Sequence, residues 1–423
     1  MTTAEQTTEH GRDLESREKR GLALLGLPTF GLALSITVVS TYVPTVARQF
    51  TGSTTVIGVL VGGEGLAALF LPVLAGSWSD RLRTPIGGRL PFIIAGVPVA
   101  AAALVAMGLV RSLGAMAIAV GVFFIGYFIA YEPYRALYPD LVPDEVAGQA
   151  QSTQAVWRGA GTGVALLGGG LLLSIGTELP FVAGAIIVAS SCAAFVLLSV
   201  RRGIEQRDPS GDTVRETLSK LREMLVHERP LRAFFFANAL WELALAALKT
   251  FVILWLTRGL GVTLAEAALV VGVTALFVLG GAAISGKLAD KFGRRRIMLI
   301  AMLVFGFGLI IPTVTTFKPV LVAAVPFISF GGGVLLSLPY ALLQPLMPER
   351  HHGALTGYYS ASRGIGVMLG PLLAGAAISA FKTTFSSTQG YSATWAVCSA
   401  AILLSVPLLL RMGDEADKAD QSE

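Results

Sequence analysis

The sequence predicts an all-α membrane protein in which twelve transmembrane helices form two pseudo-symmetric six-helix bundles. Three observations support this prediction: an apolar composition, twelve separate apolar stretches and an internal repeat. Of the 423 residues, 54% are hydrophobic and only 14% are charged. An average soluble domain carries roughly a quarter charged residues. A soluble fold of this length could not bury so much apolar surface, so lipid must solvate much of the chain.

Each apolar stretch is about as long as a transmembrane helix, which needs about 20 mostly apolar residues. The 48 glycines favour close helix packing in a bilayer. The predicted spans are residues 21–47, 54–78, 91–111, 113–138, 155–175, 179–200, 231–257, 264–286, 297–317, 320–346, 354–381 and 389–411.

Polar segments divide the chain into two bundles, residues 21–200 and 231–412. Residues 1–20 lack the apolar core of a signal peptide and are interpreted as a cytoplasmic tail, as are residues 413–423. Residues 201–230 form the linker between the bundles and are rich in arginine.

The distribution of Lys and Arg predicts the orientation, because cytoplasmic loops carry an excess of these residues. Arg81, Arg83 and Arg89 follow the second span, and a basic cluster from Lys287 to Arg296 follows the eighth. Loops on the other side hold isolated cations. We therefore expect a multi-pass protein of the cytoplasmic (inner) membrane with both termini in the cytoplasm.

The two bundles share a repeat with a spacing of 205 residues. The residues Pro143, Gly148, Arg158, Gly159 and Gly161 recur as Pro348, Gly353, Arg363, Gly364 and Gly366. The loop after the second span also recurs, with Asp80-Arg81 matching Asp290-Lys291. Duplicated six-helix units are typical of transporters that bind substrate between the halves near the membrane midplane.

The loop Gly286–Arg296, with the sequence GKLADKFGRRR, resembles the cytoplasmic signature of the major facilitator superfamily. This resemblance implies the major facilitator fold and alternating access for a small-molecule solute. The two-half plan makes a monomer sufficient.

A narrower resemblance links the first half to sucrose–proton symporters of the glycoside–cation branch. It rests on Ser79-Asp80-Arg81 followed by GGRLPFI at residues 87–93, and on PYRAL at residues 133–137 followed by Asp140-Leu141. Gly88 and Leu90 replace two arginines of the first motif, and Phe124 stands where those symporters carry an aspartate. The resemblance implies a sugar substrate and a coupling proton or sodium ion, and it places a substrate-related arginine at Arg135.

Ionisable residues within spans are candidates for binding the solute or the coupling ion, because each costs about 2.5–3.5 kcal/mol to insert. Alternative roles remain open. Glu64 could be a neutral carboxylic acid that merely forms hydrogen bonds between helices, Arg135 could form a salt bridge with Glu132, and the Lys249 side chain could extend to the lipid headgroups. Aromatic residues could instead serve packing. The candidates for substrate or cation binding are Glu64, Glu132, Arg135, Asn238, Trp241, Glu242, Lys249 and Tyr127.

A second set of charged residues is predicted to form a cytoplasmic gate. As the resemblance implies, the loops after the second and eighth spans latch the two halves, with Asp80 paired to Arg363 and Asp290 paired to Arg158. A helix N-terminus favours a docked carboxylate. Local topology signalling by the basic loops is the alternative. The predicted gate residues are Asp80, Arg81, Arg158, Asp290, Lys291, Arg294 and Arg363.

The leading hypothesis is a proton-coupled symporter of a sugar or similar small solute, and the alternative is proton-coupled efflux of drugs or metabolites. The sequence contains no nucleotide-binding loop and no HExxH or GxSxG motif, so an enzyme is not expected. Two cysteines and four dispersed histidines offer no metal site, and no cofactor is expected. The net charge of +5 is modest, and the basic residues lie beside the apolar spans, as membrane topology requires. No nucleic acid partner is therefore expected.

Overall fold

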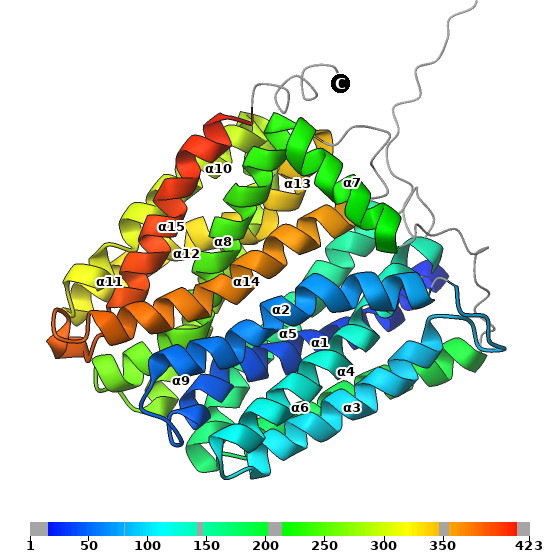
Figure 1. Ribbon diagram of the computed structural model, residues 1–423, viewed down its shortest axis with the longest axis horizontal. Helices are drawn as coiled ribbons and strands as arrows, with labels where there is room; N and C mark the ends of the chain where they lie inside the picture. The colour runs from blue at the N-terminus through cyan, green and yellow to red at the C-terminus, as the bar shows by residue number, and fades with distance from the viewer. Residues whose placement is uncertain (1–15, 80, 142–146, 202–213, 347–354, 413–423) are drawn as a thin grey trace, which may run out of the picture.

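The computed structural model describes residues 16–79, 81–141, 147–201, 214–346 and 355–412, and within them it contains helices and turns but no strands. Twelve helices are long and apolar enough to cross a membrane. They form two six-helix bundles, one coloured blue to teal and the other green to red in Figure 1. The predicted fold class is confirmed.

The first bundle contains six helices, one for each predicted span. They are α1 (Ser16–Ala47), α2 (Thr54–Ser79), α3 (Leu90–Leu109), α4 (Leu113–Leu141), α5 (Ala147–Ile175) and α6 (Leu179–Arg201). The segment between the bundles contains a further helix, α7 (Val214–His227), which packs against α8 and also contacts α2 and α14.

The second bundle has more interruptions than the first. Its elements are α8 (Arg229–Leu254), η2 (Trp255–Gly259), α9 (Leu264–Phe292), α10 (Arg294–Gly308), α11 (Ile311–Val314), α12 (Lys318–Ser337), α13 (Pro339–Leu343), η3 (Gln344–Leu346), α14 (Leu355–Ala380), η5 (Ser386–Thr388) and α15 (Ala393–Leu410).

Local chemistry explains several of these helix ends. Thr263 and Glu266 form a capping box at the start of α9, in which each side chain accepts a hydrogen bond from the other residue's backbone N–H. Gly293 ends α9 with a φ of 88°, a conformation that favours glycine. The predicted span 320–346 is interrupted after Ser337, because Pro339 has no N–H to continue the α12 ladder.

The two bundles repeat the same packing. In the first, α1 packs on α5 and α6, while α3 packs on α4 and α6. In the second, α8 packs on α14 and α15, while α10 packs on α12 and α15. Arg89 donates a hydrogen bond to the Ala136 carbonyl, and Arg294 donates one to the Ala341 carbonyl at 3.4 Å. Because both members of the second pair lie 205 residues after those of the first, the sequence repeat is also a structural repeat.

Three helix pairs join the bundles. The most extensive is α2 with α14, which lie side by side across the centre of Figure 1, followed by α5 with α9 and by α1 with α8. Glycines permit the first two contacts. A Cβ at Gly65 would collide with the backbone of Gly364 and Met368, and one at Gly170 would collide with Ala268.

The interface between α2 and α14 begins at the membrane side opposite the chain ends. The number of described spans is even, so the start of α1 and the end of α15 lie on one side. On the opposite side, Thr54 Oγ1 donates to the Gly375 carbonyl at 2.8 Å and lies 2.8 Å from Ser379 Oγ. Glycine contacts continue this interface through Gly58 and Gly62 to Gly65. The halves are therefore in close contact on the side away from the start of α1 and the end of α15; this side is called the sealed side below.

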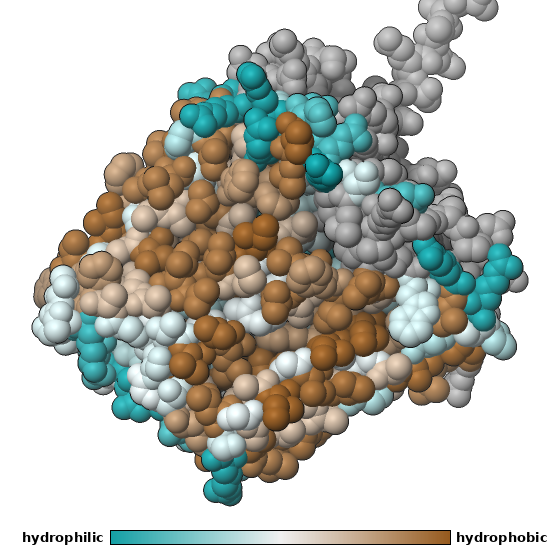
Figure 2. All heavy atoms as spheres, viewed as in Figure 1, coloured by the Kyte–Doolittle hydropathy of each residue, from teal (hydrophilic) through white to brown (hydrophobic). Residues whose placement is uncertain are grey.

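The outer surface fits a lipid solvent. Figure 2 shows a wide apolar band over the helices, with hydrophilic side chains gathered at the helix ends. Large apolar side chains such as Phe70, Ile118 and Val322 are exposed within this band. In water such a surface would be an aggregation hazard, whereas lipid covers it at no cost.

We expect Gly65→Ala to destabilise the protein, because the added methyl group forces α2 and α14 apart. Overpacking of this kind typically costs about 1–3 kcal/mol. Thermal unfolding of the purified protein should show a lower Tm. Gly76→Ala, on the same helix with nothing within 4 Å of the new methyl, is the matched control. Equal stability of the two variants would contradict the proposed close contact.

Candidate functional site

An ion pair lies at the centre of the second bundle. Arg363 Nε on α14 lies 3.5 Å from Glu242 Oε1 on α8. The Arg363 side chain is 41% exposed and that of Glu242 14% exposed, so solvent can enter the site from the arginine side. The pair satisfies two charges that would otherwise be costly within a span.

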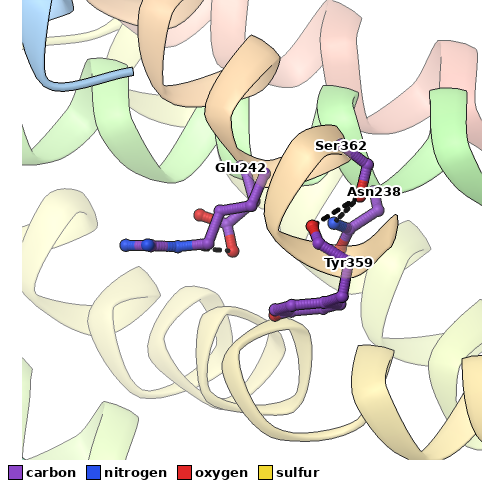
Figure 3. Close-up of polar contacts among 5 residues, drawn as sticks. Asn238, Glu242, Tyr359 and Ser362 are labelled. Carbon is purple, nitrogen blue, oxygen red and sulfur yellow. Dashed lines mark hydrogen bonds and ion pairs between the residues drawn. The ribbon is translucent and has the colours of Figure 1, made fainter. Parts of the chain in front are cut away.

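Small residues of α14 set the distance between the two partners. Gly366 packs directly against α8 at Ala239 and Glu242, and Gly370 packs against Leu243. One turn away, Asn238 Nδ2 donates to Ser362 Oγ at 2.8 Å. Ser362 Oγ in turn donates to the Tyr359 carbonyl at 2.8 Å, as drawn in Figure 3. These bonds fix the rotation of α14 and so direct Arg363 towards Glu242.

The first bundle contributes a second carboxylate. Glu64 on α2 is only 5% exposed and is followed by Gly65, which touches Gly364 of α14. Glu64 therefore lies in the same part of the interface as Arg363, although no ion pair within 4 Å joins the two side chains among the described residues. It interacts electrostatically with Arg363, Glu242 and Lys249. Two acidic and two basic side chains, drawn from both bundles, thus form one charged cluster.

A polar and aromatic group lies next to this cluster. Arg135 on α4 interacts electrostatically with Glu132 and Tyr131 of its own helix and with Tyr340 and Tyr359 of the second bundle. The rings of Tyr340 and Tyr359 meet edge to face, with centroids 5.5 Å apart.

On the first bundle's side, the rings of Tyr127 and Tyr131 stack at 5.3 Å with an interplanar angle of 15°. The site therefore presents flat apolar faces beside charged hydrogen-bond donors, and it draws them from both bundles.

Most predicted binding residues come together here. Glu64, Glu242 and Lys249 share the charged cluster, and Arg135, Glu132 and Tyr127 lie beside it. In the described structure no ion pair joins Glu132 to Arg135, so the arginine is not occupied by a local salt bridge.

Two predicted binding residues are instead used in packing. Trp241 is fully buried and its Nε1 donates to Ser405 Oγ of α15 at 2.8 Å, so it points into the second bundle. Asn238 is also fully buried, with Nδ2 used by Ser362 and Oδ1 without a partner among the described residues. The sequence could not distinguish these orientations, because both residues lie on the same helix as Glu242.

The predicted gate is only partly visible in the structure. Asp80 lies outside the described residues. Arg363, its expected partner, pairs with Glu242 and belongs to the central cluster. Arg158 and Asp290 are both exposed, and no ion pair links them within the described chain. A latch on the side of the chain ends would form only when that side is closed, so it stays a prediction.

The other gate residues lie at the ends of the spans. Arg294 binds the Ala341 carbonyl and so ties α10 to α13. Lys291 Nζ lies over the Phe292 ring at 5.2 Å, and Arg81 is exposed. Arg89 makes the equivalent hydrogen bond in the first bundle, to the Ala136 carbonyl. In the sequence, Arg89 supported the orientation and the symporter-like motif, but this contact was not predicted. The 205-residue repeat was the signal that relates the two arginines.

Tyr359 was missed as a site residue, and Tyr131 was considered only as one of several aromatic residues that could stack on a sugar ring. Tyr131 precedes Glu132, and Tyr359 lies four residues before Arg363, one helical turn away. Helical periodicity around the two arginines would have found both tyrosines. The described residues contain no group of three or more metal-ligating side chains.

These features define a class of protein. Twelve spans in two repeated bundles, with charged residues from both bundles at the interface, are the architecture of a membrane transporter rather than an enzyme. The chain belongs to the Major Facilitator Superfamily, whose sequence model matches residues 25–254 and 234–423.

The sequence relatives include bacterial efflux proteins. The chain is 24% identical over 390 residues to the "Multi-drug resistance efflux pump PmrA homolog" of Lactococcus lactis subsp. lactis (strain IL1403), covering 88% of this chain and 92% of that protein. It is 31% identical over 96 residues to "Multidrug resistance protein 3" of Bacillus subtilis (strain 168). The second match spans 23% of this chain and only 19% of that protein.

Solved structures share the fold at low sequence identity. A bacterial homologue of the human lysosomal transporter Spinster, in an inward-facing and occupied conformation, has a TM-score of 0.70 at 17% identity, covering 97% of this chain and 98% of that chain. A D-xylose–proton symporter has a TM-score of 0.72 at 14% identity, covering 95% of this chain and 98% of that chain.

We expect Trp241→Phe to lower stability while leaving solute binding unchanged. The variant removes the hydrogen bond to Ser405 and leaves its buried Oγ without that donor, a loss of about 0.5–1.5 kcal/mol. Tm and solute affinity measured on the same preparation separate the two effects. A normal Tm with weakened solute binding would indicate that Trp241 contacts the solute and would contradict the packing role.

Proposed function

We propose that the protein couples proton movement to the symport of a sugar or related hydroxyl-rich solute. The observation that supports this proposal is that Arg363 forms an ion pair at 3.5 Å with Glu242 of its own bundle and interacts electrostatically with Glu64 of the other bundle. One guanidinium thus interacts with two carboxylates that move relative to one another when the bundles rock.

The coupling step follows from electrostatics. A charged Glu64 attracts Arg363 and Lys249 across the interface and holds the two bundles together. A proton on Glu64 cancels that attraction, and Arg363 is left with Glu242 alone. The interface then opens at a lower cost. Proton binding and the change of access are in this way parts of one equilibrium.

Arg135 is the proposed centre of solute binding. Its guanidinium offers five donors in a fixed geometry, suited to vicinal hydroxyls or carboxylates. The neighbouring tyrosines add hydroxyl groups and ring faces, which suit the apolar face of a sugar. Because Tyr340 and Tyr359 come from the second bundle, a solute bound at Arg135 would contact both halves.

The orientation completes the proposal. With both chain ends in the cytoplasm of a bacterial inner membrane, as the Lys and Arg distribution predicts, the sealed side at Thr54 and Gly375 faces outward. The described conformation then corresponds to the inward-facing state of the cycle.

Proton-coupled efflux is the second candidate function, favoured by the two relatives named as multidrug proteins. The charges of the lining balance, because Arg363, Lys249 and Arg135 are offset by Glu64, Glu242 and Glu132. The guanidinium donors and the tyrosine hydroxyls suit a hydroxyl-rich solute, and transport assays with sugars and with cationic dyes separate the two candidates.

We expect Glu64→Gln to uncouple transport from the proton gradient. In proteoliposomes with an imposed pH gradient, the wild type should accumulate sugar and alkalinise the compartment from which protons are drawn. The variant should retain exchange of sugar but lose accumulation. Glu178→Gln, at an exposed glutamate on a loop, is the matched control. Gradient-driven accumulation in Glu64→Gln would refute this role for Glu64.

We expect Arg135→Ala to weaken solute binding by about 10–100-fold, because hydrogen bonds to a charged group are worth about 1.5–3 kcal/mol. Binding of candidate sugars to the purified protein, measured by calorimetry, provides the test, with exposed Arg111→Ala as control. Binding and transport of cationic dyes in place of sugars would establish the efflux candidate.

A further inference from the structure

A second polar site lies at the sealed side of the membrane, away from the central cluster. It is a pocket of about 270 Å³ between the two bundles. The first bundle supplies Thr45 and Arg48 from the end of α1. The second bundle supplies Leu254, Thr257, Arg258 and Leu264. The pocket exists only while the two bundles are in contact here.

The charge of this pocket is unbalanced. Each bundle contributes one arginine, and no acidic side chain is among the described residues that line the pocket. Glu266, two residues after Leu264, is engaged by Thr263 in the capping box of α9. Arg48 Nη1 donates to the Thr51 carbonyl at 3.2 Å, and Arg258 is exposed. Both guanidinium groups line the same pocket, so an anion bound there would be attracted by each of them.

Buried hydroxyl groups near the arginines also lack regular hydrogen bonds. Thr45 Oγ1 is buried and makes no hydrogen bond to any described residue. The hydroxyl of Tyr391 lies near both Arg48 and Arg258, and its oxygen interacts with the Arg48 side chain without meeting the geometry of a regular hydrogen bond. Burial raises the pKa of Tyr391, so this hydroxyl keeps a proton that it can donate. Unsatisfied buried groups of this kind are costly and need an explanation.

The backbone that carries Arg258 is unusual. Residues Trp255–Gly259 form a π-helical turn at the end of α8, and such turns occur frequently at functional sites. The turn is anchored by Trp255, whose Nε1 donates to Ser392 Oγ at 3.2 Å and whose ring meets that of Trp395 at 4.8 Å. A rigid support on the second bundle therefore holds Arg258 at the pocket.

We propose that this pocket binds a small oxyanion or a carboxylate group, and that the bound anion stabilises the contact between the two bundles on this side. The proposal is independent of the solute and the ion used at the central site. It makes the sealed state sensitive to anions, since the pocket is dismantled when the bundles separate here.

The first test measures anion binding by the purified protein in nanodiscs. Inorganic phosphate, titrated at constant ionic strength against a chloride background, should raise the Tm by a few degrees. The apparent phosphate affinity should fall at least tenfold in Arg48→Gln and in Arg258→Gln. Lys318→Gln, at an exposed lysine on the same side but outside the pocket, should behave as the wild type. An equal response in all four proteins, or none in the wild type, would overturn the proposal.

The second test asks whether the anion closes the interface. A cysteine pair at Thr55 and Ser379, whose hydroxyl groups lie 3.3 Å apart, reports closure through its rate of disulfide formation. Phosphate should increase this rate at least twofold, and Arg258→Gln should abolish the increase. A rate that does not depend on phosphate, despite binding, would remove the gating part of the proposal.

A competition experiment identifies the source of the anion. Displacement of phosphate by glucuronate but not by glucose would assign the pocket to an anionic group of a solute. Phosphate binding without such displacement would assign it to an inorganic ion. Both results support an anion site, and displacement by glucose as well would count against it.

Discussion

The contact between α2 and α14 determines where the charged centre lies. Gly58, Gly62 and Gly65 let the backbones of two helices from different bundles touch, since a Cβ at any of them would collide with α14. This contact brings Glu64 close enough to Arg363 for the two side chains to interact electrostatically. In a bilayer, where the hydrophobic effect does not drive helices together, such close packing is a main source of association. The same interface is therefore a structural contact and the location of the coupling chemistry.

Electrostatic balance is the second constraint on this centre. Glu64 and Glu242 offset Lys249 and Arg363, so that the four groups sum to zero when all are charged. Buried charges are tolerated only when paired. The ion pair within the second bundle persists whatever the other bundle does, because α8 and α14 are neighbours in that bundle. Glu64 is the member whose surroundings change when the two bundles move.

The fold was largely predictable from the sequence, and the site only in part. Twelve apolar stretches and a 205-residue repeat are strong one-dimensional signals, and the helices follow them closely. The sequence also singled out Glu64, Arg135, Glu242 and Lys249, because charged residues within spans are few, and the structure brings these side chains into one region of the interface. It could not show which way Trp241 points, since helix rotation depends on contacts with α14 and α15.

The pairing of Arg363 with Glu242 was missed for a related reason. The repeat assigns Arg363 the same role as Arg158, but the tertiary contact between α8 and α14 gives it a partner of its own. The π-turn at Trp255 has no recognisable sequence signal, so the pocket beside it required the structure.

The balance of charges in the central cluster has a bioenergetic consequence. An empty carrier whose four central charges cancel carries no net charge from that cluster through its return step. If the proposed coupling holds, a neutral solute moved with one proton carries one positive charge per cycle. Each 100 mV of membrane potential then contributes about 2.3 kcal/mol, equivalent to roughly 50-fold accumulation of the solute. Uptake would then be driven by voltage as well as by the pH gradient.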